Sequence, residues 1–362
     1  MSLNAVIFNS EDKKRVKDFL KLPKRLYARA ELTQNEADEL ALLNGKHILS
    51  RYFKITPILV YRDERAVSRA VVTIYPDDSA AYVGFFESEN DGAAAGMLFD
   101  TVTRIAADNT KTEIIGPVDC SFWIKYRLKT NRFGIPYTGE PYNKSYYLKL
   151  WEENGFEVSQ RYFSNQYMVV DGNEGCEKYA ARLAEKQNEG YEIKSPRADN
   201  FDETLREVYS LLIELYSGFP AYKRISETEF CVMFKYLKSI LDYDMVKMAY
   251  YDKKAVGFFI SVPNFKNSVY GRMNPLKLLK ILCEKMKPRS YVMLYMGVDQ
   301  THRGLGKALA EAIRRELKKR RVPSVGALIR SGNCNKDYME RLIDFEYEYV
   351  LLKKSIRGNE TV

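Results

Sequence analysis

The sequence contains little histidine and tryptophan, with two residues of each type among 362, and it has five cysteines. The two histidines, His47 and His302, stand far apart, so a histidine-rich metal centre is not expected and we predict no bound metal. The cysteines form no CxxC pair, which argues against both a disulfide framework and a zinc site. Five buried free thiols are the simplest interpretation.

Long apolar runs are also missing, because no window approaches the roughly 20 continuous apolar residues of a membrane-spanning helix. We therefore expect no membrane partner. The first residues, MSLNAVIFNSEDKKRV, lack the order of basic, apolar and small residues that marks a secretory signal, so the expected location is cytoplasmic. A composition of 46% hydrophobic and 29% charged residues is typical of a folded globular protein.

Positive charge is in excess, with a formal net charge of +9. Basic surfaces attract polyanions of any kind, so the charge alone does not select nucleic acid as a partner. The densest basic run, RRELKKRR from Arg314 to Arg321, is explained by cations that complement the dipole at the end of a helix and keep one face solvated. We therefore do not expect a nucleic-acid partner.

The length predicts two compact units of roughly 150 to 200 residues each. In the first half, four runs are typical of strands: Phe53–Glu64, Arg69–Pro76, Ser79–Glu87 and Lys111–Val118. Between the last two, GAAAGMLFDTVTRIAA is typical of a helix, which predicts a parallel strand–helix–strand crossover. A further helix is expected from Asn143 to Phe156, followed by strands.

The sequence becomes polar and rich in turn residues after about Asp171. The predicted domains are residues 1–172 and residues 191–362, joined by a linker at residues 173–190. The second half begins with a strand and two helices, for which Asp202 and Ser226 are the expected N-caps. After two more strands, the strand SYVMLYMGV leads into a helix, the strand SVGALIR, a short helix after Asn333 and a final strand.

The two halves thus follow one plan, which predicts a duplicated α/β fold with a mixed sheet. The most informative stretch is VDQTHRGLGKAL, where glycines stand at the start of the helix that follows SYVMLYMGV. Glycine lets a ligand approach the backbone closely, and the first turn of a helix has unpaired N–H groups. Two cationic side chains, Arg303 and Lys307, accompany them. The stretch is suited to bind a pyrophosphate, although an ordinary glycine-containing helix start explains it equally well.

The run YMGVDQTHRGLGKALAEAI resembles the acetyl-CoA signature of the GNAT superfamily of N-acetyltransferases, in which a strand is followed by [QR]xxGx[GA]. The resemblance covers about Tyr191 to Ile356 well and Leu32 to Val170 in weaker form. It implies two tandem GNAT-like domains, with the loop backbone on the pyrophosphate of CoA and the preceding strand beside the pantetheine arm. The residues implied to bind acetyl-CoA are Met296, Val298, Arg303, Gly304, Leu305, Gly306, Lys307, Ala308 and Asn333.

The implied chemistry is attack of a neutral amine on a thioester, which needs a base and an acid. The family often places an acidic tyrosine seven residues after the helix-leading asparagine, but counting from Asn333 this position is Glu340. Tyr338 lies nearby on the same expected helix. Both Tyr338 and Glu340 are candidates only, because each is equally explained by packing or by solvation.

The first half has FFESENDGAAAGML at the equivalent place, with Glu87, Glu89 and Asp91 where the second half has its phosphate loop. Carboxylates at a helix start repel a pyrophosphate, so this domain is expected to be degenerate and not to bind CoA there. The long aromatic segment from Gly116 to Tyr147 is interpreted either as part of an acceptor site or as the cover of a sheet edge.

The resulting hypothesis is an acetyl-CoA-dependent N-acetyltransferase that acts on a small amine. One alternative is an aminoacyl-tRNA-dependent transferase with a double GNAT-like fold, since a basic surface suits tRNA. The other is a non-catalytic CoA-binding sensor, because the expected tyrosine is missing and a fold does not settle function. The acceptor and the oligomeric state stay open.

Overall fold

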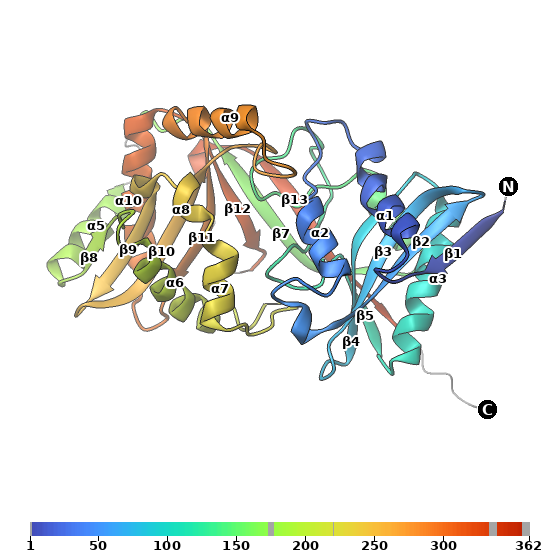
Figure 1. Cartoon of the computed structure of the whole chain (residues 1–362). Coiled ribbons are helices and arrows are strands. Elements are labelled where there is room, and N and C mark those ends of the chain that lie inside the picture. Colours follow the sequence, from blue (N-terminus) through green and yellow to red (C-terminus); the bar gives the residue numbers. More distant parts are fainter. Residues whose placement is uncertain (1, 173–176, 220, 333–338, 357–362) are drawn as a thin grey trace.

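The computed structural model describes residues 2–172, 177–219, 221–332 and 339–356 of the chain. Within these residues thirteen strands join in one mixed sheet, whose two ends belong to the two halves of the sequence (Figure 1). In spatial order the strands are β1 (Leu3–Ile7), β2 (Lys54–Arg62), β3 (Arg65–Ile74), β4 (Ala80–Ser88), β5 (Glu113–Gly116), β13 (Ile343–Ser355), β7 (Glu157–Tyr167), β12 (Ser324–Arg330), β11 (Tyr291–Val298), β10 (Lys254–Pro263), β9 (Val246–Tyr251) and β8 (Glu192–Lys194), with β6 (Leu128–Lys129) paired to β13.

Two pairs of neighbouring strands in this sheet are parallel, β4 with β5 and β11 with β12. A helix joins the strands of each pair, α3 (Gly92–Asp108) in the first half and α10 (Leu305–Arg320) in the second. The strand–helix–strand crossover expected from the sequence of the first half is therefore confirmed, and the second half repeats it.

The last strand of each half pairs with the other half. β7 lies beside β12, with Tyr167 opposite Ser324, and β13 lies beside β5, with Leu352 opposite Gly116. β7 and β13 also pair with each other and cross the middle of the molecule in Figure 1. Each half thus completes its part of the sheet with a strand from the other half. The domain limits drawn from the sequence stay a proposal, because the sheet continues through both halves.

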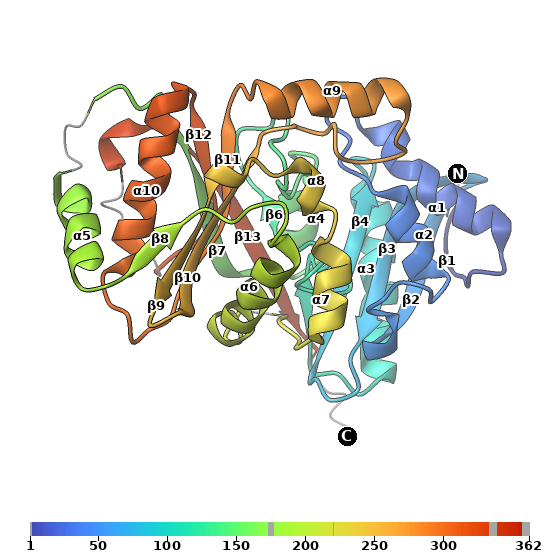
Figure 2. The ribbon, with the colours of Figure 1, turned by 60° about the vertical axis from the view of Figure 1, so that its left-hand side comes forward.

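Helices cover both faces of the sheet (Figure 2). Successive residues of a strand point to opposite faces, so in β2 Ile58 packs in the core beneath α3 and Leu59 in the core beneath α1.

None of the described helices combines the length and the apolar character that crossing a bilayer requires. The remaining helices are α1 (Lys13–Leu26), α2 (Glu36–Leu43), α4 (Tyr147–Glu152), α5 (Glu177–Asn188), α6 (Phe201–Leu215), α7 (Glu227–Phe234), α8 (Leu237–Ile240) and α9 (Pro275–Met286), with short 3₁₀ turns η1 (Ser50–Tyr52), η2 (Tyr243–Met245) and η3 (Glu340–Leu342).

The two halves also share a hydrophobic core. Trp123 of the first half meets the ring of Phe230 in α7 edge-on, with 5.9 Å between ring centroids. The indole N–H of Trp123 donates to the carbonyl oxygen of Lys223 at 2.6 Å. The Tyr52 hydroxyl donates to the Glu229 carboxylate at 2.6 Å. These contacts bury aromatic side chains from both halves, which stabilises their association by roughly 2 kcal/mol per large side chain.

Some helices differ from the sequence prediction. The expected linker contains α5, which packs along α10. The helix expected from Asn143 to Phe156 is limited to α4, because the Asn143 amide bonds the backbone N–H and C=O of Lys129 and holds that part of the chain outside the helix. The capping box of Ser226 is confirmed, whereas the N-cap of α6 is Asn200 and not Asp202.

Candidate functional site

The candidate site begins where β11 and β12 separate. The two strands pair from Tyr291 with Ser324 to Met293 with Gly326, and their register ends there. Beyond this point β12 keeps pairing with β7, with Arg330 opposite Tyr162. The carboxyl-terminal half of β11 therefore has a partner on one side, β10, and is separated from β12 on the other. A separation of two parallel strands above a helix start leaves backbone groups open to a ligand.

The loop after β11 leads directly to the first turn of α10. The Asp299 carboxylate accepts hydrogen bonds from the backbone N–H of Thr301 at 2.9 Å and from its hydroxyl at 2.8 Å, which fixes the turn and lowers the pKa of Asp299. Gly304 is the N-cap of α10, with a φ of +81°, and none of the described side chains caps the helix there. The positive end of a long helix is thus left for an external anion.

The residues of this loop divide into two groups. Leu305 and Ala308 lie on the buried face of α10, are fully buried and anchor the helix to the sheet. Gly306 is partly exposed, and a Cβ there would make only ordinary van der Waals contacts, with the side chains of Met296 and Val298 at 3.9 Å. Together with the uncapped amides and the neighbouring Arg303 and Lys307 of the sequence, this fits a pyrophosphate group, which needs close backbone approach and positive charge.

One further cation beside the loop was not found from the sequence. A Cβ on Gly304 would lie 3.1 Å from Cδ and 3.2 Å from Nε of Arg182, so the arginine side chain lies across the N-cap. Arg182 belongs to α5 and also forms an ion pair with Glu185 at 2.6 Å. Because residues 173–190 were expected to be a linker, no sequence signal connected Arg182 with the loop.

Of the two predicted catalytic residues, Tyr338 and Glu340, the structure describes only Glu340. Asn333 and Tyr338 lie outside the described residues. Glu340 is exposed and begins η3, just before β13. The first residue of β13, Ile343, pairs with Tyr167, and Tyr167 pairs with Ser324 at the beginning of β12. Glu340 therefore lies near the amino-terminal end of β12, whereas the strands separate toward its carboxyl-terminal end. The structure does not bring Glu340 together with the loop.

The equivalent place in the first half is filled by the chain itself. β4 and β5 also stop pairing after three residues, but the N–H of Val118 then donates to the Val83 carbonyl at 2.8 Å. The N–H of Phe85 donates to the Asp119 carboxylate at 2.5 Å. A Cβ on Gly84 would lie 2.0 Å from the Val118 carbonyl oxygen, so glycine is required for this close approach.

The start of α3 is occupied by carboxylates. Asp91 is the N-cap of α3, accepts a hydrogen bond from Ala94 at 3.1 Å and forms an ion pair with Arg62. Glu89 pairs with Arg65. Burial raises the pKa of Glu87, which accepts hydrogen bonds from two tyrosine hydroxyls. Of the three acidic residues singled out in the sequence, Asp91 therefore caps α3, Glu89 lies in the loop before it, and Glu87 is buried in β4.

A group of tyrosines and one arginine lies next to the end of β11. The Tyr216 hydroxyl, at the end of α6, donates to the Met296 carbonyl at 3.5 Å. Burial raises the pKa of both Tyr216 and Tyr295, and the positive charge of Arg127 acts in the opposite direction on each. These two hydroxyls therefore stay protonated at neutral pH.

Arg127 belongs to the aromatic segment from Gly116 to Tyr147. Its guanidinium carbon lies 3.8 Å from the ring centroid of Tyr126 and 4.2 Å from that of Tyr162, so the cation is held between two rings. It donates to the Tyr126 hydroxyl, and its buried Nε has no hydrogen-bond partner within the part of the chain that the structure describes. Among the described residues no carboxylate forms an ion pair with Arg127. A guanidinium held in this way is suited to bind a carboxylate.

The same segment contributes a buried ion pair, Lys129 with Glu140. Burial lowers the pKa of Lys129 and raises that of Glu140. Glu140 accepts a hydrogen bond from Tyr349 at 2.7 Å, and Tyr349 is bonded to Tyr137 at 2.9 Å. The segment is therefore built into the middle of the sheet through β13, and it does more than cover a sheet edge.

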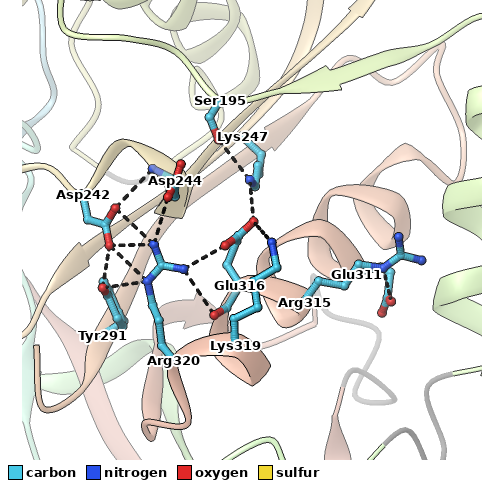
Figure 3. A network of polar contacts seen from close by, with 10 residues as sticks. All are labelled: Ser195, Asp242, Asp244, Lys247, Tyr291, Glu311, Arg315, Glu316, Lys319 and Arg320. Atoms are coloured by element: carbon cyan, nitrogen blue, oxygen red, sulfur yellow. Dashed lines mark hydrogen bonds and ion pairs between the residues drawn. The ribbon is translucent and has the colours of Figure 1, made fainter.

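The basic run at the end of α10 is largely engaged in ion pairs. Arg320 contacts Asp242 at 3.0 Å and Glu316 at 2.8 Å, and Lys247 also reaches Glu316 (Figure 3). Arg314 is only 4% exposed and pairs with buried Glu311. The expected solvated face holds for exposed residues such as Arg315 and Lys319. Arg314 is instead buried against Glu311 of the same helix, and Arg320 attaches α10 to Asp242.

No family model matches the sequence, and no curated protein matches it. Solved structures do resemble the fold. A tandem GNAT protein from the clavulanic acid biosynthesis pathway, solved without acetyl-CoA, aligns over 98% of this chain and 99% of its own with a TM-score of 0.52 at 12% identity. A GCN5-related N-acetyltransferase from Sphaerobacter thermophilus aligns over 98% and 96% with a TM-score of 0.48 at 13% identity. A probable N-acyltransferase of Enterococcus faecalis aligns over 98% and 73% with a TM-score of 0.48 at 11% identity.

The fold is therefore that of the GNAT superfamily. More specifically, the chain has the tandem form of this fold, with two GNAT-like halves in one polypeptide, as the sequence resemblance implied.

Proposed function

We propose that the protein is an acyl-CoA-dependent N-acyltransferase in which only the second half binds the donor. The observation that carries this proposal is the contrast between the two strand separations. Between β11 and β12 the separation leads to an uncapped, glycine-led helix start, whereas between β4 and β5 Val118 and Asp119 occupy it. Acetyl-CoA is the proposed donor, because the loop carries the acetyl-CoA signature of the superfamily.

The proposed donor contacts follow from the loop geometry. The backbone from Gly304 to Lys307 holds the pyrophosphate at the positive end of α10, and the side chains of Arg182, Arg303 and Lys307 add charge around it. The end of β11, from Met296 to Val298, lies beside the pantetheine arm. Asn333 stays a proposed contact of the same arm.

The acceptor is proposed to be a small amine that also carries a carboxylate. Arg127 supports this, because a guanidinium between two rings, with no acidic partner among the described residues, is a ready partner for a substrate carboxylate. The acceptor amine attacks the thioester carbonyl as its neutral form, so that a carbon–nitrogen bond forms and the carbon–sulfur bond breaks. The nitrogen then releases one proton to water, and the departing thiolate takes up one proton. A tyrosine that stays protonated is suited to supply this proton, and we propose Tyr216 for this role.

The experiment is calorimetric titration of the intact chain with acetyl-CoA, followed by an assay of free thiol release with a panel of amines. Binding with turnover supports the enzyme. Binding without turnover by any amine in the panel, with and without a carboxylate, supports the CoA-binding sensor. Absence of binding overturns the donor site and directs the next assay to aminoacyl-tRNA.

A further inference from the structure

Helix α9 exposes most of its apolar side chains. In the chain it follows β10 and precedes β11, and it begins at Pro275, after the N-cap Asn274. Ile281 is its one buried residue. The exposed large apolar residues of α9, with the residue that precedes its N-cap, have relative exposures between 46% and 80%, and they are Met273, Leu276, Leu278, Leu279, Leu282 and Met286. Isolated exposed leucines are common on protein surfaces, but a whole helix face of them is a mark of an interaction site.

The apolar residues share one side of the helix. At 100° per residue, Leu278, Leu282, Met286, Leu279 and Leu276 fall within an arc of about 160°. The opposite side attaches α9 to the molecule. There the Lys285 ammonium donates to the Ser239 carbonyl at 2.7 Å, and Lys277 donates to the Tyr270 carbonyl. The helix therefore packs through Ile281 and the polar side chains around it and turns its wider apolar side to solvent, the reverse of a surface helix in a globular protein.

The surroundings of this face are basic. From Arg272 to Arg289 the sequence has six basic residues and one acidic residue, Glu284, which lies 3.7 Å from Lys280. Arg272, Lys280, Lys287 and Arg289 are exposed. Figure 2 places α9 along the outer edge of the molecule, where a flat surface can reach it.

We propose that α9 docks the protein on the surface of an anionic phospholipid bilayer. The apolar face enters the region between headgroups and acyl chains, and the basic residues around it contact lipid phosphates. A helix of twelve residues is about 18 Å long, so its apolar face covers a few hundred Å², well below the roughly 800 Å² per partner of a stable protein dimer. A symmetric pairing of two such faces would also bring like charges together.

This proposal departs from the expectation of no membrane partner, which rested on the lack of a membrane-spanning segment. Peripheral docking needs no such segment. It is also independent of the proposed acyltransferase activity, since it uses a different surface and different residues.

The test is co-sedimentation of the full chain with phosphatidylcholine vesicles that contain about one-third phosphatidylglycerol, and with vesicles of phosphatidylcholine alone. The chain is expected to bind the anionic vesicles, and added salt is expected to weaken binding. The double variant Leu278→Glu/Leu282→Glu is expected to bind at least about ten-fold more weakly. Ile135→Glu is the matched control, because Ile135 is 56% exposed and lies in the first half, and it should bind as the unchanged chain does.

All these positions are exposed, so the variants are expected to fold, and circular dichroism checks this. A Leu279→Trp variant gives a second readout, since its fluorescence should shift to shorter wavelength when the face enters the bilayer. Absence of vesicle binding, or equal binding of the double variant, overturns the proposal. So does a dimer in light scattering that the double variant abolishes, because the face would then be the contact between two copies.

Discussion

Gly84 and Val118 close the first half against a ligand, because the space for a Cβ on Gly84 is taken by the Val118 carbonyl oxygen at 2.0 Å. The residues that correspond in the second half are in strands that separate without such a contact within the described residues. One tandem fold thus contains one filled and one open strand separation. This difference in backbone geometry, added to the carboxylates at the start of α3, is the basis of the proposal that donor binding is confined to one half.

We predict that Glu89→Arg leaves the number of acetyl-CoA molecules bound per chain at one. Removing a negative charge from the start of α3 lowers repulsion, but Val118 and Asp119 still fill the separation between β4 and β5. Calorimetric titration of the variant measures the stoichiometry. Two molecules per chain would mean that charge alone had excluded the ligand.

Gly306→Trp is expected to abolish acetyl-CoA binding while leaving the fold intact. The added ring would occupy the space above the first turn of α10, where a Cβ has nothing closer than 3.9 Å. Gly134→Trp serves as the control, since a Cβ on Gly134 would meet no atom within 4 Å and this residue lies outside the loop. Equal affinity of the Gly306 variant and the control, measured by titration, would rule out the loop as the donor site.

Arg127→Gln is expected to raise the KM for a carboxylate-bearing acceptor at least about ten-fold, with a smaller change in kcat, because a charge-assisted contact is lost on binding. An amine of similar size without a carboxylate should show little change. Arg132→Gln is the control, as Arg132 is exposed and contacts the ring of Phe345. A similar loss with both amines would assign Arg127 a purely structural role.

Tyr216→Phe is expected to lower kcat about ten-fold or more without weakening acetyl-CoA binding, since a proton donor for the departing thiolate is removed. Glu340→Gln should leave kcat almost unchanged, because Glu340 lies near the other end of β12. Steady-state kinetics and titration of the two variants separate the alternatives. A large loss of kcat in the Glu340 variant, with kcat unchanged in the Tyr216 variant, would make Glu340 the candidate acid and reject Tyr216.

Glu311→Gln is expected to lower the free energy of unfolding by about 3 kcal/mol at pH 7, since it removes a buried carboxylate that accepts two charged hydrogen bonds from Arg314. Burial alone would raise the pKa of Glu311, but hydrogen bonds from Arg314 and Arg315 outweigh it and lower the pKa below 4.5. A carboxylate with a lowered pKa stabilises the fold above its unfolded pKa and loses this effect as the pH falls through the folded value.

The loss of unfolding free energy in the Glu311 variant, relative to the unchanged chain, should therefore be largest above about pH 5. This loss should shrink as the pH falls below 4.5. Denaturant unfolding at several pH values measures it. Glu64→Gln, at an exposed turn, is the control and should show no comparable deficit. A deficit of the same size at every pH would mean that packing, and not charge, explains the loss.

Much of the second half could be predicted from local sequence. The strand before the loop, the glycines at 304 and 306 and the helix that follows form one contiguous stretch, so spacing alone indicates them. Runs of apolar residues likewise mark β2, β3 and β4. The start of α7 could be predicted from the capping box of Ser226, because this signal depends on residues only three positions apart.

Features that depend on distant contacts could not be predicted in this way. β7 and β13 are alike as strands, and nothing in either sequence says which half it joins. Arg182 reaches Gly304 only because α5 packs along α10. Arg127 lies in an irregular segment with a φ of +94°, a backbone conformation that no local pattern indicates. Asn333 and Tyr338 stay predictions, since they lie outside the described residues.

The central claim is that one half of the tandem fold binds the acyl donor. Calorimetric titration of the intact chain with acetyl-CoA tests it most directly, because affinity and stoichiometry are read together. The account predicts one molecule bound per chain. Two molecules per chain, or no binding at all, would contradict it.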